Sequence, residues 1–105
     1  MKELIKYKGY QIAPAELEAL LLGHPKVMDA AVIGVLDDDK QEIPKAFIVA
    51  APGADLTDTE VMEFVASQVA PHKKVRRVEF IEAIPKSAAG KILRKDLRAR
   101  ETAQV

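Results

Sequence analysis

Residues 28–51, MDAAVIGVLDDDKQEIPKAFIVAA, contain two apolar runs that a short acidic segment separates. Residues 28–36 are mostly apolar and rich in Val and Ile, which is typical of a strand buried on both faces. Residues 37–40 are polar and predict a turn, after which residues 43–51 return as a second strand. The segment therefore predicts a buried β-hairpin.

On the N-terminal side, a shorter strand pair and a helix precede this hairpin. Residues 4–12 carry strand-forming Tyr and Ile side chains around Gly9, which predicts two short strands joined by a turn. Pro14 stands at the first position of a predicted helix, and Gly23 begins the Gly-His-Pro segment that ends it. The predicted order up to residue 25 is therefore strand, strand, helix.

On the C-terminal side, a helix, a strand and a second helix follow. Thr57 and Glu60 have capping-box spacing and start a helix that ends near Pro71. Its apolar stripe consists of Val61, Phe64, Val65 and Val69. Residues 75–84 alternate as a third strand, which places Val78, Phe80 and Ile84 on one face, and residues 92–100 predict a basic helix.

The complete order predicts a small α+β domain. Its central sheet has three strands, is mostly antiparallel and is flanked by helices, and a short N-terminal β-hairpin precedes it. The chain has 105 residues, of which 49% are apolar and 30% charged, so we expect one domain that spans residues 1–105.

Composition also excludes several classes of protein. The sequence contains no cysteine, which excludes disulfides, thiolate zinc sites and thiol catalysis. No apolar run approaches the roughly 18 residues that a membrane helix needs, and the N-terminus has no secretory leader pattern. We therefore expect a cytoplasmic protein without a membrane span.

The net charge of zero conceals an uneven distribution. Residues 1–70 carry six Lys and Arg against twelve Asp and Glu, whereas residues 71–105 carry ten against four, so the two parts balance at −6 and +6. A local positive field attracts phosphate-bearing ligands, although the same residues also fit a solvated basic helix. Nucleic-acid binding is not predicted, because Phe80 alone offers an aromatic side chain near the basic part.

Residues 85–91, PKSAAGK, form the first candidate site. Gly90 and its small neighbours allow a ligand to approach the backbone, and the Lys91 ammonium suits a carboxylate or a phosphate. The spacing is not that of a Walker phosphate loop. An ordinary surface turn before a basic helix is the alternative interpretation.

The second candidate is a group of lysines near the N-terminus. Lys2, Lys6 and Lys8 are separated by even numbers of residues, so a strand would place them on one face. Three ammonium groups on one face indicate either an anion bound against them or an edge strand that lysines protect from aggregation.

Other polar residues predict no catalytic or metal centre. His24 and His72 lack nearby carboxylate or cysteine companions at ligand spacing, and Ser87 has no accompanying His and Asp arrangement. Residues 37–39, three aspartates, are not followed by the glycine and glutamate of a calcium loop. We therefore expect no metal site in this chain.

Two longer motifs resemble a known family. Residues 5–18, IKYKGYQIAPAELE, and residues 84–95, IPKSAAGKILRK, are similar to motifs in the C-terminal domain of the adenylate-forming enzymes. This superfamily comprises acyl- and aryl-CoA ligases, firefly luciferase and nonribosomal adenylation domains. The likeness extends along almost the whole chain and is greatest to ligases of the 4-coumarate-CoA and fatty-acyl-CoA type.

The resemblance implies a two-step reaction. A carboxylate first attacks ATP to give an acyl adenylate and pyrophosphate, and a thiol, usually that of CoA, then displaces AMP. By position, Lys91 is implied to be the adenylation lysine, which bridges the substrate carboxylate and the ATP α-phosphate. The small domain is expected to rotate between the steps and to present a different face in each.

The N-terminal motif implies further roles. Lys6 and Gln11 match residues that contact the adenylate during thioester formation, and Lys8 and Gly9 match the lining of the CoA pantetheine path. Lys2 matches the hinge at which the domain rotates.

The resemblance also implies a large N-terminal domain, with a phosphate loop and a pocket for an acyl or aryl carboxylate, that this sequence lacks. We therefore expect the isolated chain to fold but to be inactive. ATP, AMP and CoA would bind in the full-length enzyme, Mg²⁺ mainly outside this domain, and no cofactor tightly to this chain. The alternative is a free-standing docking module, or a target whose Lys91 loses its charge to a lysine acetyltransferase.

Overall fold

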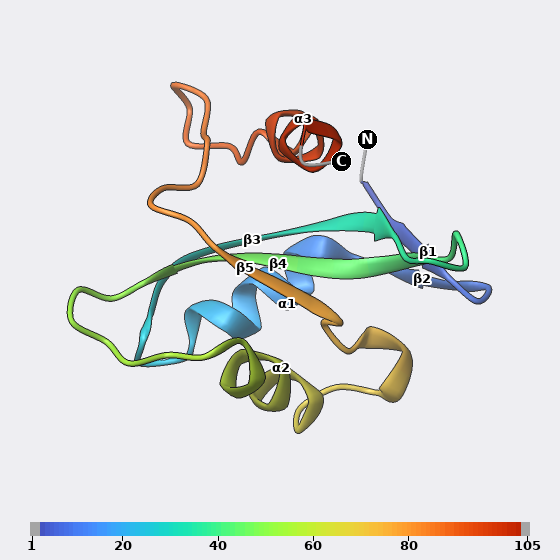
Figure 1. Cartoon of the computed structure of the whole chain (residues 1–105), viewed down its shortest axis with the longest axis horizontal. Helices are drawn as coiled ribbons and strands as arrows, with labels where there is room; N and C mark the ends of the chain where they lie inside the picture. Colours follow the sequence, from blue (N-terminus) through green and yellow to red (C-terminus); the bar gives the residue numbers. More distant parts are fainter. Residues whose placement is uncertain (1–2, 104–105) are drawn as a thin grey trace.

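The computed structural model describes residues 3–103, which form a three-stranded sheet between helices on both faces (Figure 1). The elements in chain order are β1 (Ile5–Tyr7), β2 (Tyr10–Ile12), α1 (Pro14–Leu22), β3 (Val27–Leu36), β4 (Glu42–Ala50), α2 (Asp58–Ala66), the 3₁₀ turn η1 (Pro71–Lys73), β5 (Arg77–Phe80) and α3 (Arg94–Ala103). Helices α1 and α2 cover one face of the sheet, and α3 covers the other (Figure 1). The α+β class and the order of elements are as predicted.

The sheet has the strand order β3-β4-β5. Strands β3 and β4 are the predicted antiparallel hairpin, with nine paired positions, and β5 lies parallel to β4 with four. The sheet is therefore mixed, and antiparallel pairing accounts for most of it. The predicted N-terminal hairpin is also present, because β1 and β2 pair antiparallel in a sheet of their own.

The middle of strand β3 is buried on both faces, as its apolar run predicted, whereas Met28 and Leu36 near its ends are exposed. Ala30 and Val32 point into a first core beneath α1 and α2, whereas Ala31 and Ile33 point into a second core beneath α3. The first core also contains Ile5, Ile12, Leu17, Leu21, Val27, Ala46, Ile48, Val61, Val65 and Val75. The second core also contains Phe47, Val49, Ile84 and Leu97.

The third strand is shorter than the alternation of residues 75–84 predicted. Val78 packs against the first core, whereas Ile84 lies in the second. A continuous strand would place these two residues, six positions apart, on one face, so the predicted shared face is wrong for Ile84. The pairing with β4 ends at Phe80, which is 40% exposed.

Two helices also differ from their predicted bounds. Helix α2 begins with the predicted capping box, in which Thr57 and Glu60 bond reciprocally, but it ends at residue 66, well before Pro71. There the side chains of Ser67 and Gln68 both donate to the Phe64 carbonyl, at 2.9 and 3.0 Å. Competition for this carbonyl at the end of the helix accompanies the early stop.

Helix α3 begins two residues later and ends three residues later than predicted. Ile92 cannot start the helix because it pairs antiparallel with Lys86, and the Leu93 N–H donates to the Pro85 carbonyl at 2.9 Å. The residues just before the helix therefore form part of a small turn structure.

Candidate functional site

The first group of predicted site residues lies on the hairpin of residues 5–12, called here the hairpin end. Lys8 and Gly9 form its two-residue turn, with φ angles of +47° and +85°. Positive φ at both positions is the type I′ geometry that suits the twist of a hairpin. Ile5 and Ile12 pair across the strands and are buried, which leaves the other face of the hairpin to solvent.

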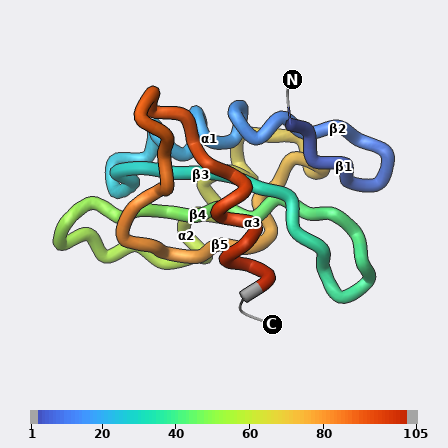
Figure 2. The backbone as a smooth tube through the Cα atoms, turned by 90° about the horizontal axis from the view of Figure 1, so that it is seen from above, coloured from blue at the N-terminus to red at the C-terminus, as the bar shows by residue number. Residues whose placement is uncertain are grey.

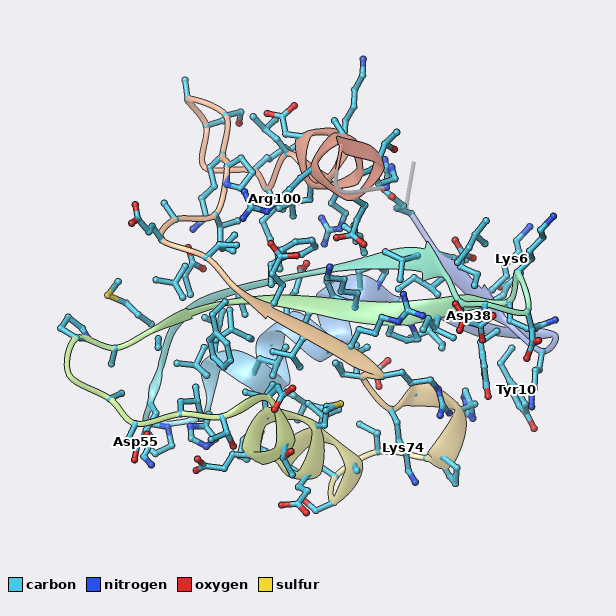
Figure 3. The ribbon with its side chains drawn as sticks, in the orientation of Figure 1. Lys6, Tyr10, Asp38, Asp55, Lys74 and Arg100 are labelled. Carbon is cyan, nitrogen blue, oxygen red and sulfur yellow. The ribbon has the colours of Figure 1, made fainter. Side chains whose placement is uncertain are left out.

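Lys6 and Gln11 occupy this outer face together. They are direct cross-strand partners, and both side chains are exposed. The structure therefore brings together the two residues that were predicted to contact an adenylate. The Lys6 side chain extends from the hairpin in a different direction from Tyr10, which lies on the inner face (Figure 3).

The predicted single face of three lysines is wrong for Lys8. Its left-handed φ ends the strand alternation, and its ammonium lies over the Tyr7 ring, 5.4 Å from the centroid. Tyr7 packs against the first core, so Lys8 leans away from the face that Lys6 occupies. Lys2, the predicted hinge residue, lies outside the described residues.

A basic and aromatic groove lies beside the turn. The groove is lined by Tyr7, Lys8, Tyr10, Pro71, His72 and Arg76. The His72 ring stacks on Tyr10 with centroids 3.9 Å apart, and the Arg76 guanidinium lies 4.5 Å from the Tyr7 centroid. These stacked contacts hold η1 and the residue before β5 against the inner face of the hairpin.

The hairpin end is tied to the sheet by one polar contact in addition to its buried isoleucines. The Lys6 backbone N–H donates to Glu42 Oε1 at 2.6 Å. The Glu42 side chain lies over Gly34, where an added Cβ would be 2.5 Å from Glu42 Oε2. Sequence reasoning missed both residues, because they belong to the central hairpin and meet β1 only in the folded chain.

The second group lies in the loop of residues 85–93, called here the loop end. Lys86 and Ile92 pair antiparallel at its base. Ser87 closes the turn, because its N–H donates to the Lys91 carbonyl at 2.9 Å and its Oγ accepts from the Lys91 N–H at 3.2 Å. Gly90 has a φ of +84°, which favours glycine over any residue with a side chain.

Lys91 is exposed at this closed turn. Among residues 3–103, no carboxylate lies within ion-pair distance of its ammonium. The backbone of Lys91 is thus fixed by local hydrogen bonds, whereas its side chain stays available to a ligand. This arrangement fits the contact with an anion that its sequence position suggested.

Two ion pairs hold the loop end against the fold. Arg94 Nη2 lies 2.7 Å from both oxygens of Glu18, and Lys86 Nζ lies 2.7 Å from Asp29 Oδ2. The Glu18 carboxylate also accepts from the Val32 N–H at 2.8 Å. Burial raises the pKa of Glu18 above its usual value, and the bonds from Val32 and Arg94 oppose this shift.

Sequence reasoning missed the burial of Glu18. A signal was present, because Glu18 lies beside Leu17 and three residues before Leu21, on the apolar side of the predicted helix. It also missed Lys45, which is buried in β4 and bonds to Glu79 at 2.8 Å and to Glu101 of α3. Both residues join elements that are distant in sequence.

The hairpin end and the loop end lie in opposite halves of the molecule. Figure 1 and Figure 2, which are related by a 90° rotation, both place the β1–β2 hairpin at one extreme of the long axis and residues 85–93 in the other half. The domain measures 38 × 32 × 28 Å along its principal axes.

Within residues 3–103, no three or more His, Asp or Glu side chains are grouped so that they could hold a metal ion. None of the helices in the same range has the length and hydropathy needed to cross a membrane.

Known proteins are similar to this chain in both sequence and fold. The family model described as the AMP-binding enzyme C-terminal domain matches residues 16–91. The 4-coumarate:CoA ligase 1 of Petunia hybrida is 58% identical over 105 residues, which are 100% of this chain and 19% of that protein.

Solved structures agree with this match. An acyl-CoA synthetase from Brucella canis superposes with a TM-score of 0.88 and 39% identity, over 97% of this chain and 19% of its own. The fatty acyl CoA synthetase of Mycobacterium tuberculosis superposes with a TM-score of 0.87 and 35% identity, over 97% of this chain and 20% of that protein. The chain spans about one fifth of the length of these relatives. It therefore belongs to the AMP-binding enzyme C-terminal domain family, the small domain of the adenylate-forming superfamily.

Proposed function

We propose that this chain is the mobile C-terminal domain of an ATP-dependent ligase that joins a carboxylic acid to the thiol of CoA. In the first step a carboxylate oxygen attacks the α-phosphorus of ATP, and the bond to pyrophosphate breaks. In the second step the thiol sulfur attacks the acyl carbon, AMP leaves with the electrons of the acyl–oxygen bond, and the thiol loses its proton. The observation that supports this proposal is that two groups of exposed residues, each predicted to bind a ligand, lie in opposite halves of one domain.

Lys91 serves the first step. Negative charge develops on the oxygens of the α-phosphate during attack, and a fixed ammonium stabilises that charge more than it stabilises the substrates. The closed turn around Lys91 and its free ammonium support this role. Such a group contributes about two to three powers of ten in rate.

The hairpin end serves the second step. Lys6 and Gln11 share an exposed face on which they can contact the adenylate, and Lys8 and Gly9 form the turn along which the pantetheine arm of CoA passes. Because this face lies far from Lys91, the domain must rotate on its large N-terminal partner between the steps. We assign that rotation to a hinge at Lys2.

The remaining requirements fall on the large domain of a full-length ligase. That domain supplies the phosphate loop, the pocket for an acyl or aryl acid and the main ligands of Mg²⁺, so residues 1–105 alone form one inactive domain. We further propose a cytoplasmic location, where ATP and CoA are plentiful. The names of the plant relatives make 4-coumarate the first acid to test.

The two half-reactions of the full-length ligase test this proposal. In Lys91→Ala, adenylate formation falls by about two to three powers of ten, while thioester formation from a supplied acyl adenylate largely persists. Lys6→Ala shows the opposite bias. Lys95→Ala, which removes an exposed lysine of α3 near the loop, is the matched control and leaves both steps intact. Equal loss of both steps in Lys91→Ala would contradict the assignment.

The exposure of Lys91 also favours a second candidate, in which a lysine acetyltransferase modifies this residue. Acetylation removes the charge on which the adenylation role depends. Mass spectrometry after incubation with an acetyltransferase and acetyl-CoA tests this idea. Modification of other lysines without Lys91 argues against it.

A further inference from the structure

We propose that Glu18 and Asp29 are positioning residues for Lys91. Their ion pairs with Arg94 and Lys86 hold the two sides of the loop end against α1 and β3, and they thereby fix the point from which the Lys91 side chain extends. This inference rests on the proposed role of Lys91 in adenylate formation.

The first ion pair restrains the C-terminal side of the loop. Arg94 follows Lys91 by three residues, and its guanidinium binds both oxygens of Glu18 at 2.7 Å. Its Nε also donates to the Val32 carbonyl at 3.3 Å, while the Val32 N–H donates to Glu18 Oε2 at 2.8 Å. One residue of β3 therefore bonds to both members of the pair and fixes the plane in which they lie.

The second ion pair restrains the N-terminal side. Lys86, which pairs with Ile92 across the base of the loop, binds Asp29 Oδ2 at 2.7 Å. The other oxygen of Asp29 accepts from the Ala30 N–H at 2.9 Å, so the carboxylate itself is held in one orientation. Both sides of the loop are thus attached to β3, three residues apart along that strand.

Stability alone does not account for the Glu18–Arg94 pair. The two side chains are only 9% and 18% exposed, and the desolvation of a buried ion pair usually offsets most of the attraction between its charges. Such a pair does, however, enforce one geometry, because either charge left without its partner is strongly unfavourable. A catalytic ammonium needs that property, since a misplacement of about 1 Å can reduce a rate about a hundredfold.

The test measures both half-reactions of the full-length ligase with an acid that it turns over. In Glu18→Gln, the rate constant of adenylate formation falls about ten- to a hundredfold, with little change in the KM for ATP. Thioester formation from supplied acyl adenylate stays near the wild-type rate. Asp29→Asn, at a more exposed pair, reduces adenylate formation about two- to fivefold.

Glu101→Gln is the matched control. It removes the same charge from a carboxylate that also pairs with a buried cation, Lys45, but this pair lies at the far end of α3 and does not touch the loop. We expect adenylate formation in this variant to stay within about twofold of wild type, as for other substitutions away from the site. A fall as large as that in Glu18→Gln would show that general loosening of α3 is responsible, and it would overturn the proposal.

A double variant separates positioning from an independent effect. If Glu18 acts through Lys91, then Glu18→Gln combined with Lys91→Ala forms adenylate no more slowly than Lys91→Ala alone. The proposal would be overturned if the rate loss in the double variant were the product of the losses in the two single variants. An equal fall of both half-reactions in Glu18→Gln would also overturn it. If Glu18→Gln does not fold, Asp29→Asn takes its place in the same comparison of single and double variants with Lys91→Ala.

The same measurements distinguish this inference from the proposed function on which it rests. Full adenylate formation in Lys91→Ala would refute the assigned role of Lys91, and the inference with it. Loss of adenylate formation in Lys91→Ala, with none in Glu18→Gln or Asp29→Asn, would overturn the positioning proposal alone.

Discussion

The hairpin end and the loop end are both two-stranded turns with a glycine in the left-handed region, yet different interactions hold them in place. Ile5 and Ile12 bury the hairpin end in the first core, at 1% and 0% exposure. The loop end is held by the Glu18–Arg94 and Asp29–Lys86 ion pairs, together with Ile84 and Leu97 on either side of it in the second core.

This difference follows from what each end is proposed to do. Apolar burial is strong but does not depend on direction, which is sufficient for a hairpin that presents a broad surface to a long thiol. Ion pairs and hydrogen bonds add little net stability at partly exposed positions, but their geometry is specific. They suit an end that must hold one ammonium in one place.

The largest predicted change in stability concerns the apolar anchor of the hairpin end. Ile12→Ala leaves a cavity at a fully buried position and should reduce the free energy of unfolding by about 2–5 kcal/mol. Gln11→Ala, one residue away on the exposed face, should change it by less than about 0.5 kcal/mol. Urea denaturation of the 105-residue chain measures both, and similar small effects would show that burial does not hold this hairpin.

The two turn glycines should be equally sensitive. Gly9→Ala and Gly90→Ala each place a Cβ at a φ near +85°, with no other heavy atom within 4 Å of it. The only cost is then that of holding a residue with a Cβ in the left-handed conformation. The free energy of unfolding of each variant should fall by about 1–2 kcal/mol in the same denaturation measurement. A much larger loss at Gly90 than at Gly9 would indicate that the ion pairs hold the loop end under strain.

The pH dependence of stability should distinguish the loop end. Because the pKa of Glu18 is raised on folding, the folded chain binds a proton more tightly than the unfolded chain does. The contribution of Glu18 to the free energy of unfolding is therefore complete below its pKa in the unfolded chain, near 4.5. It decreases as the pH rises through the pKa of Glu18 in the folded chain. The free energy of unfolding of wild type minus that of Glu18→Gln should fall over this pH interval. A rise would mean that the interaction with Arg94 lowers the pKa of Glu18 more than burial raises it.

The smallest effect concerns the more exposed ion pair. The side chains of Lys86 and Asp29 are 39% and 26% exposed, so Lys86→Ala should reduce the free energy of unfolding by about 0.2–1 kcal/mol. Added salt should shrink this difference between wild type and variant, because it screens exposed charges. Lys6→Ala at the hairpin end should show no such salt dependence, and an equal response there would contradict the contrast between the ends.

Local patterns predicted most of the fold. The Val- and Ile-rich run of β3, the turn at Gly9 and the capping box at Thr57 each specify a short-range structure, and all three are present. The bounds of α2, β5 and α3 were less accurate, because contacts outside each element's own pattern decide them. These contacts are the bonds from Ser67 and Gln68 to the Phe64 carbonyl, the end of pairing with β4 at Phe80, and the pairing of Ile92 with Lys86.

The candidate site divides in the same way. Lys91 and the residues of the hairpin end were found from motifs that are contiguous in sequence. Glu18 and Asp29 were missed as site residues, since they come within reach of the loop end only when α1, β3 and α3 pack together. Lys8 was placed on the wrong face, because the sequence alone does not show where a strand stops and its turn begins.

The amino-acid sequence was thus sufficient for the class of fold, the family resemblance and the identity of the exposed lysines, because these depend on neighbours within one helix, strand or turn. Packing was needed to place the two groups of candidate residues in opposite halves of the molecule and to pair Glu18 with Arg94, 76 residues apart. The physical reason is that both results depend on how the elements pack in space, and no local pattern specifies the buried partner of a charge.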